Sequence, residues 1–276
     1  MMPAVVTLMG LGLLFGTGLA FASRVLAVKQ DERVEAIEEC LPGANCGACG
    51  FAGCSSFSEA LVEGDANPDD CTVCGSDTLS RMAEILGEDL DLSEDKEIAV
   101  VRCRGTKEAA EDRFKYAGIA DCSAAEQVAG GHKACEYGCL GQGSCVDVCP
   151  FDAIFISEEG IPVVIEEKCT ACGNCVEACP RDIIDIVPEN QNVFLLCNAE
   201  YGPREARQVC SNACIACGLC ARTCPHDAIV MQDNLPSFDF DECDGCGACV
   251  EACPADCLEL SAILQQSTEE KEDTAS

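Results

Sequence analysis

Cysteines recur in the second half of the sequence with a spacing that suits iron–sulfur chemistry. Three runs follow the pattern C-x2-C-x2-C-x3-C-P, over Cys169–Pro180, Cys214–Pro225 and Cys243–Pro254. A fourth run, Cys135–Pro150, keeps the end of the pattern and lengthens its beginning. Three cysteines at every third residue let one loop direct three thiolates at a cubane, and the fourth cysteine ligates the other cluster of a two-cluster unit. The spacing therefore predicts pairs of [4Fe–4S] clusters.

Zinc is the alternative for any single C-x2-C pair. Structural zinc sites combine two separated pairs, whereas each run here has a triplet and a distant fourth cysteine. Because three runs share the pattern, iron–sulfur clusters are the favoured interpretation.

Short strands are needed to cover these loops. Each closing proline fixes φ and turns the chain outward. It is followed by a similar apolar tail: FDAI, RDII, HDAI or ADCL. We expect each tail to begin a strand that covers a cluster, so the predicted fold class is α+β. In the last tail Cys257 takes the place of Ala228, which predicts a small core residue.

The four runs resemble bacterial two-cluster ferredoxins, as two modules in tandem from Cys135 to about Ile263. The resemblance implies crossed ligation of two clusters in each module. In the first module the implied ligand sets are Cys135, Cys139, Cys145 and Cys179, and Cys149, Cys169, Cys172 and Cys175. In the second they are Cys214, Cys217, Cys220 and Cys253, and Cys224, Cys243, Cys246 and Cys249. The C-x3-C-x5-C opening at Cys135 departs from the ferredoxin pattern and leaves its ligands open.

A separate group of cysteines lies near the start of the chain, in LPGANCGACGFAGC at residues 41–54. Together with VVRCRG, GCLGQGSCVDVCPFDAI and GPREARQVC, this segment resembles the B subunit of the Rnf family of ion-translocating ferredoxin:NAD oxidoreductases. The resemblance implies a further [4Fe–4S] cluster held by Cys46, Cys49, Cys54 and Cys71. Cys40 and Cys74 fall outside that set, as spare thiols.

The segment Pro3–Ala22 has no charged residue and is long enough to span a bilayer. A cleaved signal peptide would have a positively charged start, which this sequence lacks. Arg24 and Lys29 follow the apolar segment, as expected on the cytoplasmic side of an uncleaved anchor. We therefore expect a transmembrane helix in residues 1–28, in the cell (inner) membrane, with the cysteine-rich part in the reducing cytoplasm.

Composition agrees with a metal-dependent fold. The chain has 276 residues, 27 of them cysteine and none tryptophan, so metal ligation can supply folding free energy that a small apolar core does not. Its formal net charge of −32 would repel phosphate backbones, which excludes nucleic acid as a partner. No catalytic base, nucleophile or nucleotide-binding loop is evident.

Two apolar segments end in cysteine, VVRC at Cys103 and FLLC at Cys197, and each is followed within one loop by another, Cys122 and Cys210. Two strand ends and two loop cysteines could form a four-thiolate site between the modules. Five [4Fe–4S] clusters are therefore expected, with a sixth at Cys103, Cys122, Cys197 and Cys210. The alternative for these four is a set of buried thiols.

The expected function is one-electron transfer through a chain of clusters. The family resemblance implies soluble ferredoxin as donor, flavin-bearing and other membrane subunits as partners, NAD or another final acceptor, and coupling to Na+ or H+ movement. Alternatives are the iron–sulfur subunit of another membrane reductase or hydrogenase, and a cluster-storage or scaffold protein. The expected units are the anchor (1–28), an N-terminal cluster domain (31–90), a linker (97–134), ferredoxin-like module 1 (135–187), a connector (188–213), module 2 (214–263) and an acidic disordered tail (264–276).

Overall fold

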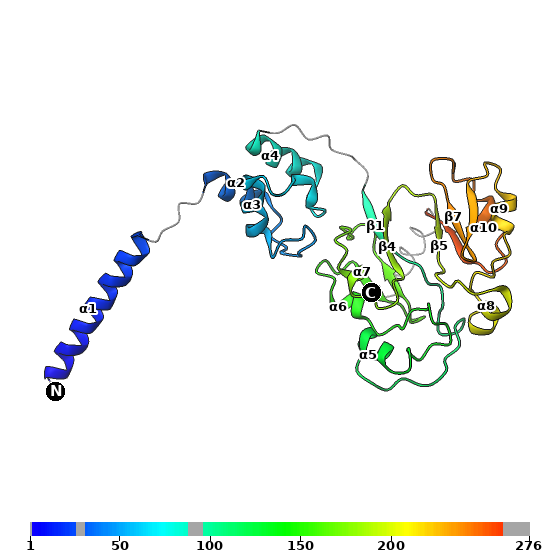
Figure 1. Ribbon diagram of the computed structural model, residues 1–276, viewed down its shortest axis with the longest axis horizontal. Coiled ribbons are helices and arrows are strands. Elements are labelled where there is room, and N and C mark those ends of the chain that lie inside the picture. The colour runs from blue at the N-terminus through cyan, green and yellow to red at the C-terminus, as the bar shows by residue number, and fades with distance from the viewer. Residues whose placement is uncertain (1, 26–30, 88–95, 262–276) are drawn as a thin grey trace.

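The computed structural model describes the backbone of residues 2–25, 31–87 and 96–261, and, within the first of these ranges, the side chains of residues 9–23. The tail expected at 264–276 lies outside the described residues. Helix α1 (Met2–Val25) extends away from the cysteine-rich units (Figure 1). No helix in the described part of the chain is both long and apolar enough to cross a membrane, so the expected anchor is not confirmed.

The N-terminal cluster domain is helical. It consists of α2 (Glu32–Cys40), α3 (Cys54–Glu63), the 3₁₀ turn η1 (Pro68–Asp70) and α4 (Ser76–Leu86). Asp31 caps α2 by accepting the main-chain N–H of Arg33 at 3.0 Å. Its small core is centred on Ile37, Phe57 and Met82, each at most 1% exposed. This core packs α3 and α4 against α2, and α3 begins at a predicted ligand, Cys54.

Module 1 is built from two antiparallel strand pairs and short helices (Figure 1). Its helices are α5 (Cys122–Gln127), α6 (Ser144–Asp147) and α7 (Asn174–Glu177). The hairpin pairs β2 (Ile154–Ile156) with β3 (Pro162–Val164), and the second pair joins β4 (Ile184–Pro188) to β1 (Glu97–Val101). Strand β1 precedes the cysteine run, in the expected linker. Because it pairs with β4, residues 97–101 of that linker form part of the sheet of module 1.

Module 2 repeats this arrangement. Its helices are α8 (Pro203–Val209), α9 (Leu219–Thr223) and α10 (Ala248–Glu251). Strand β6 (Ile229–Gln232) pairs with β7 (Leu235–Phe238), and β8 (Leu258–Leu260) pairs with β5 (Val193–Leu195), which comes from the expected connector. The predicted α+β class is therefore observed, with one strand of each module supplied from outside its cysteine repeat.

Strands β1 and β5, which come from outside the cysteine repeats, contact each other through their apolar side chains. Ile98 and Val100 of β1 pack with Phe194 and Leu196, on and just after β5, in one buried cluster that we call the inter-module seam. The alternate residue Ala99 turns into module 1, as the period of two along a strand requires. Both strands run toward a cysteine two residues beyond their ends, so the seam brings Cys103 and Cys197 to the same region.

Candidate iron–sulfur sites

The cysteines expected in the N-terminal site come together around one cavity. Cys46, Cys49, Cys54 and Cys71 all line it, whereas Cys40 and Cys74 do not. The Cys46 loop is held by Asn45, whose Oδ1 accepts the main-chain N–H of Cys54 at 2.8 Å. This contact closes the loop onto the start of α3 and orients its thiols toward the cavity.

A second cavity, in module 1, is lined by the crossed ligand set. Its cysteines are Cys149, Cys169, Cys172 and Cys175. Main-chain N–H groups point at two of the sulfurs: Ala99 donates to Cys169 Sγ and Ala153 to Cys149 Sγ, both at 3.4 Å. Such donors stabilise thiolate ligands and influence a cluster's reduction potential.

In module 2, Cys214, Cys217, Cys220 and Cys253 line a third cavity, again as the crossed pattern predicts. Cys257 lines it too, with its Sγ 3.6 Å from Cys253 Sγ. The hydrogen bond from Cys257 lowers the pKa of Cys253 to about 5. Cys257 is 2% exposed, as expected for a core residue, but it also contacts a predicted ligand.

The remaining set of module 2 lies at its surface. Cys249 is buried, and Cys224 and Cys243 are partly buried in the same apolar cluster. Cys246 is exposed, and its main-chain N–H donates to Asp244 Oδ1 at 3.1 Å. A cluster held there would be open to a partner protein.

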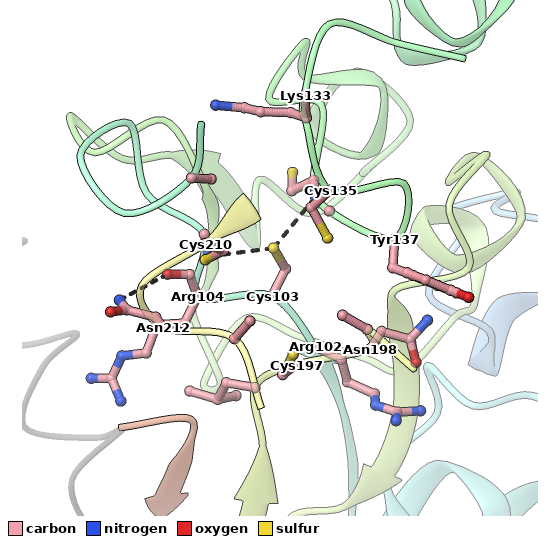
Figure 2. A pocket seen from close by; sticks show the side chains of 17 residues that line it. Arg102, Cys103, Arg104, Lys133, Cys135, Tyr137, Cys197, Asn198, Cys210 and Asn212 are labelled. Atoms are coloured by element: carbon pink, nitrogen blue, oxygen red, sulfur yellow. Dashed lines mark hydrogen bonds between the residues drawn. The ribbon is translucent and has the colours of Figure 1, made fainter. Parts of the chain in front are cut away.

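A fourth cavity, which we call the central cavity, lies where the modules meet (Figure 2). Its cysteines are Cys103, Cys135, Cys139, Cys197 and Cys210. Cys122, which the sequence grouped with three of these, does not line it. Instead, the main-chain N–H of Cys122 donates to Ser144 Oγ at 2.8 Å, next to Cys145. The structure thus separates Cys122 from the group in which it was expected and brings Cys135 into that group.

The donors fit iron–sulfur ligation. Burial raises the pKa of Cys135 to about 11 and that of Cys145 and Cys197 to about 12. These thiols are therefore protonated unless a metal binds, because a coordinating thiol gives up its proton. Among the described residues, no three His, Cys, Asp or Glu side chains converge on a point that could hold a single metal ion. The sulfurs instead surround cavities, and in the three complete four-cysteine sets the lining is mostly apolar.

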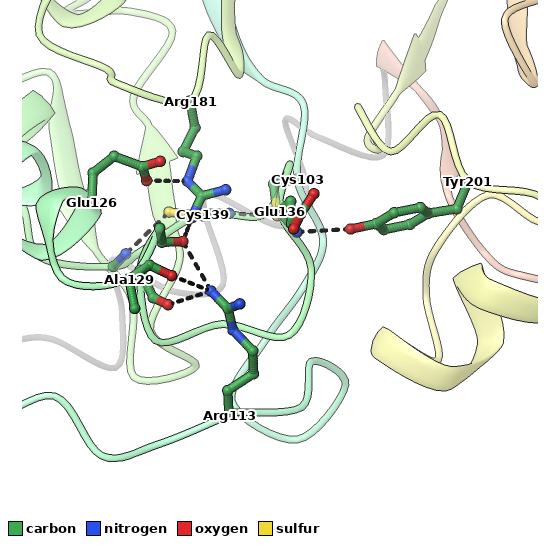
Figure 3. Close-up of polar contacts among 11 residues, drawn as sticks. Cys103, Arg113, Glu126, Ala129, Glu136, Cys139, Arg181 and Tyr201 are labelled. Atoms are coloured by element: carbon green, nitrogen blue, oxygen red, sulfur yellow. Dashed lines mark hydrogen bonds and ion pairs between the residues drawn. The ribbon is translucent and has the colours of Figure 1, made fainter.

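Several basic residues between Arg102 and Lys115 are committed to internal contacts. Arg102 pairs with Asp185 at 2.8 Å. Arg113 donates to the carbonyl oxygens of residues 129, 130 and 131 (Figure 3). Arg181 reaches the same loop and pairs with Glu126 at 2.6 Å. These contacts fold the chain around the Cys135 run and leave fewer free charges at the surface.

Three segments match known families. Residues 41–73 match the family described as "Putative Fe-S cluster", and residues 134–183 and 207–260 match two families described as "4Fe-4S dicluster domain". The first range lies within the expected N-terminal cluster domain, and the other two overlap the expected modules 1 and 2.

Sequence similarity to known proteins extends over most of the chain. The sequence is 45% identical to the B subunit of the Na(+)-translocating ferredoxin:NAD(+) oxidoreductase complex of Acetobacterium woodii, over 84% of this chain and 69% of that protein. It is 42% identical to the B subunit of the proton-translocating ferredoxin:NAD(+) oxidoreductase complex of Clostridium ljungdahlii, over 84% and 82%. It is 37% identical to the B subunit of the ion-translocating oxidoreductase complex of Methanosarcina acetivorans, over 87% and 90%.

Proposed function

The chain belongs to the family formed by the B subunits of ion-translocating ferredoxin:NAD(+) oxidoreductase complexes, and we propose that it is the iron–sulfur electron-transfer subunit of such a complex. The observation that carries this proposal is the gathering of three complete four-cysteine sets, each around its own cavity. A [4Fe–4S] cluster supplies one-electron redox chemistry when it is bound. The chain's own residues would ligate, shield and orient these groups.

We propose that electrons travel from module 2 through module 1 to the N-terminal site. Asn174 supports the last step, since its Nδ2 donates to the carbonyl oxygen of Cys46 at 3.4 Å. Asn174 also lines the cavity of Cys169, Cys172 and Cys175. One side chain therefore joins the two loops that would hold successive clusters.

The electron would enter at module 2. Among the described cysteines, only Cys246 has an exposed side chain, so a cluster held there would be accessible to a protein donor. Soluble ferredoxin is the donor that the relatives' names imply. The crossed ligation and buried thiols favour fixed redox centres over cluster storage.

We propose that α1 joins the protein to the membrane part of the complex. Seven of its large apolar side chains are 57–72% exposed and need an apolar environment: Met9, Leu11, Leu13, Leu14, Phe15, Leu19 and Phe21. Arg24 and Lys29 follow in the sequence and favour the cytoplasmic side for the cysteine-rich part. Flavin-bearing and other membrane subunits would complete the path to NAD or another acceptor, coupled to Na+ or H+ transfer.

Substitution of Cys46 tests the route. In the assembled complex, Cys46→Ser should leave both modules reducible by ferredoxin and stop electron flow to the membrane subunits. Cys40→Ser is the matched control, because Cys40 does not line the cavity. Normal onward transfer in the Cys46 variant would place the exit elsewhere. Stoichiometric zinc in the anaerobically isolated protein would overturn the iron–sulfur function as a whole.

A further inference from the structure

The central cavity contains a four-cysteine arrangement that does not follow the ferredoxin pattern. Cys103 and Cys197 approach from the two strands of the inter-module seam, Cys210 follows α8, and Cys135 opens the module 1 run (Figure 2). Cys135, Cys197 and Cys210 are at most 7% exposed. We propose that Cys103, Cys135, Cys197 and Cys210 hold a [4Fe–4S] cluster that bridges the two modules. This inference rests on the proposed iron–sulfur function.

The fifth cysteine of the cavity belongs with a neighbouring set. Cys139 packs with Cys145 and Cys179 in the core cluster of module 1, whereas Cys135, Cys197 and Cys210 belong to the core cluster that extends into module 2. Cys122 is tied to α6 through its hydrogen bond to Ser144 Oγ. Cys122 therefore completes the module 1 set with Cys139, Cys145 and Cys179, in the position that the ferredoxin pattern gives to Cys135.

Glycines leave room for the bridging ligands. A Cβ on Gly105 would lie 3.3 Å from Cys103 Sγ and 3.8 Å from Cys210 Sγ, so this backbone lies close to both sulfurs. A Cβ on Gly138 would lie 3.5 Å from Cys135 Sγ. The Tyr201 hydroxyl, from the connector before α8, accepts the main-chain N–H of Glu136 at 3.0 Å (Figure 3). Because Tyr201 packs against the apolar cluster that extends into module 2, this contact fixes the Cys135 loop against that module.

Backbone contacts connect the bridging set to a ligand on each side. The main-chain N–H of Cys139 donates to Cys103 Sγ at 3.3 Å, and that of Cys214 donates to Cys197 Sγ at the same distance. Cys139 and Cys214 are ligands of the neighbouring sites in modules 1 and 2. An electron that ferredoxin has delivered to the Cys214 site would thus pass to the bridging site and from there to the Cys139 site. Each transfer would oxidise the site that gives up the electron and reduce the site that receives it.

The central cavity also differs from the other three cysteine cavities in the basic residues that line it. Arg102, Arg104 and Lys133 line it, while the other three cysteine cavities have no lysine or arginine among their described lining residues. Lys133 is buried and pairs with Asp112 at 2.9 Å. Positive groups stabilise the added electron, so the bridging cluster should have a higher potential than it would without them.

Paired substitutions in the full chain, loaded with iron and sulfide anaerobically, test which cysteines share a cluster. The wild type should bind about 24 iron atoms, four for each of six clusters. Cys103→Ala with Cys135→Ala should remove about four, as should Cys122→Ala with Cys145→Ala, because each pair shares one cluster. The crossed pair, Cys103→Ala with Cys122→Ala, should remove about eight.

Other results would overturn the inference. If the crossed pair removes about four and the Cys103–Cys135 pair about eight, Cys122 and not Cys135 is the bridging ligand. A wild-type count near 20 that Cys103→Ala leaves unchanged means that no bridging cluster exists, although the proposed function survives. A wild type that binds no iron would instead overturn the proposed function.

A second variant avoids losing a ligand. Lys133→Gln should lower the midpoint potential of one cluster in an EPR-monitored redox titration and leave the iron content unchanged. Arg81→Gln, an exposed change in α4, is the control. If Lys133→Gln moves no potential, no cluster lies in the central cavity.

Discussion

Arg104 and Glu259 form an ion pair between the segment after β1 and strand β8 of module 2, with 3.2 Å between Nη1 and Oε2. The Glu259 side chain is 5% exposed and that of Arg104 30%. Two residues earlier, Arg102 pairs with Asp185 of β4 in module 1. The arginines on either side of Cys103 therefore hold different modules, and this fixes the position of Cys103 between them.

Arg104→Gln should weaken the contact between the modules. Removing one partner of a largely buried ion pair should cost about 2 kcal/mol here, less than for a fully buried pair because Arg104 is partly exposed. The melting midpoint of the cluster-loaded protein should fall by about 4–8 °C. Arg204→Gln, an exposed change in α8, should alter stability by about 0.5 kcal/mol or less. Equal melting midpoints for the two variants would show that the pair contributes nothing.

Gly53→Ala should damage the N-terminal site alone. The added Cβ would lie 2.7 Å from Asn45 Oδ1, which accepts the N–H of Cys54, so Asn45 must move and the Cys46 loop opens. We expect a loss of about four iron atoms per chain. Gly75→Ala is the control, since no atom lies within 4 Å of its added Cβ. Full iron content in the Gly53 variant would show that the loop tolerates the displacement.

Cys257→Ala should change a potential without removing a cluster. Alanine fits this position, because Ala153 and Ala228 stand at the same place in two other tails. The variant loses the thiol 3.6 Å from Cys253 Sγ, and with it a hydrogen bond that stabilises the added electron. One midpoint potential should fall in an EPR-monitored titration while iron stays at the wild-type level. A loss of about four iron atoms would instead identify Cys257 as a ligand.

Acid should release the clusters. Burial raises the pKa of Cys135 to about 11 and of Cys197 to about 12, so at neutral pH each takes up a proton when its metal leaves. Protons therefore compete with iron, and each proton taken up favours release by a factor of about ten per pH unit. Visible absorbance and released iron, followed anaerobically from about pH 8 to about pH 5, should show increasing loss toward the acid end. Release that does not depend on pH would contradict this protonation of the ligands.

We expect the basic residues between Arg102 and Lys115 to guide soluble ferredoxin by charge, because bacterial ferredoxins are usually acidic. Because Arg102 and Arg104 are ion-paired, the exposed Lys107 and Lys115 are the residues to change. The double change of both lysines to Glu should slow association at low ionic strength, and salt should reduce the difference from wild type. Stopped-flow oxidation of ferredoxin measures this rate. Equal rates at low salt would move the search to Arg204 and Arg207, which form no ion pair among the described residues.

Local spacing predicted those sites whose ligands follow one another within a run. The sets at Cys169 and Cys214 each depend on a triplet in a single loop, with a fourth ligand from the paired repeat, whereas the set at Cys46, with Cys71 as its fourth member, came from the family resemblance. The exchange of Cys122 and Cys135 could not be read in this way, because both cysteines precede the rest of module 1, and the hydrogen bond that joins Cys122 to Ser144 is visible only in the structure. The departure at Cys135 from the ferredoxin spacing was the available signal. Asn45 and Asn174 were missed because a lone asparagine in a glycine-rich loop usually indicates only a turn.

Strands β1 and β5, which each module takes from outside its cysteine repeat, also affect the order in which the modules fold during synthesis. Strand β1 can pair only after β4 has been synthesised, and β5 can pair only after β8 has been synthesised. At translation rates of about 5–20 residues per second, β1 emerges from the ribosome on the order of 10 s before its partner. During that interval Cys103 and the cysteines of module 1 belong to an unfinished chain. The sheet of module 1 is therefore complete only after residues 184–188 have been made, and that of module 2 only after β8 has been made, although the proposed ligands within each module precede these strands.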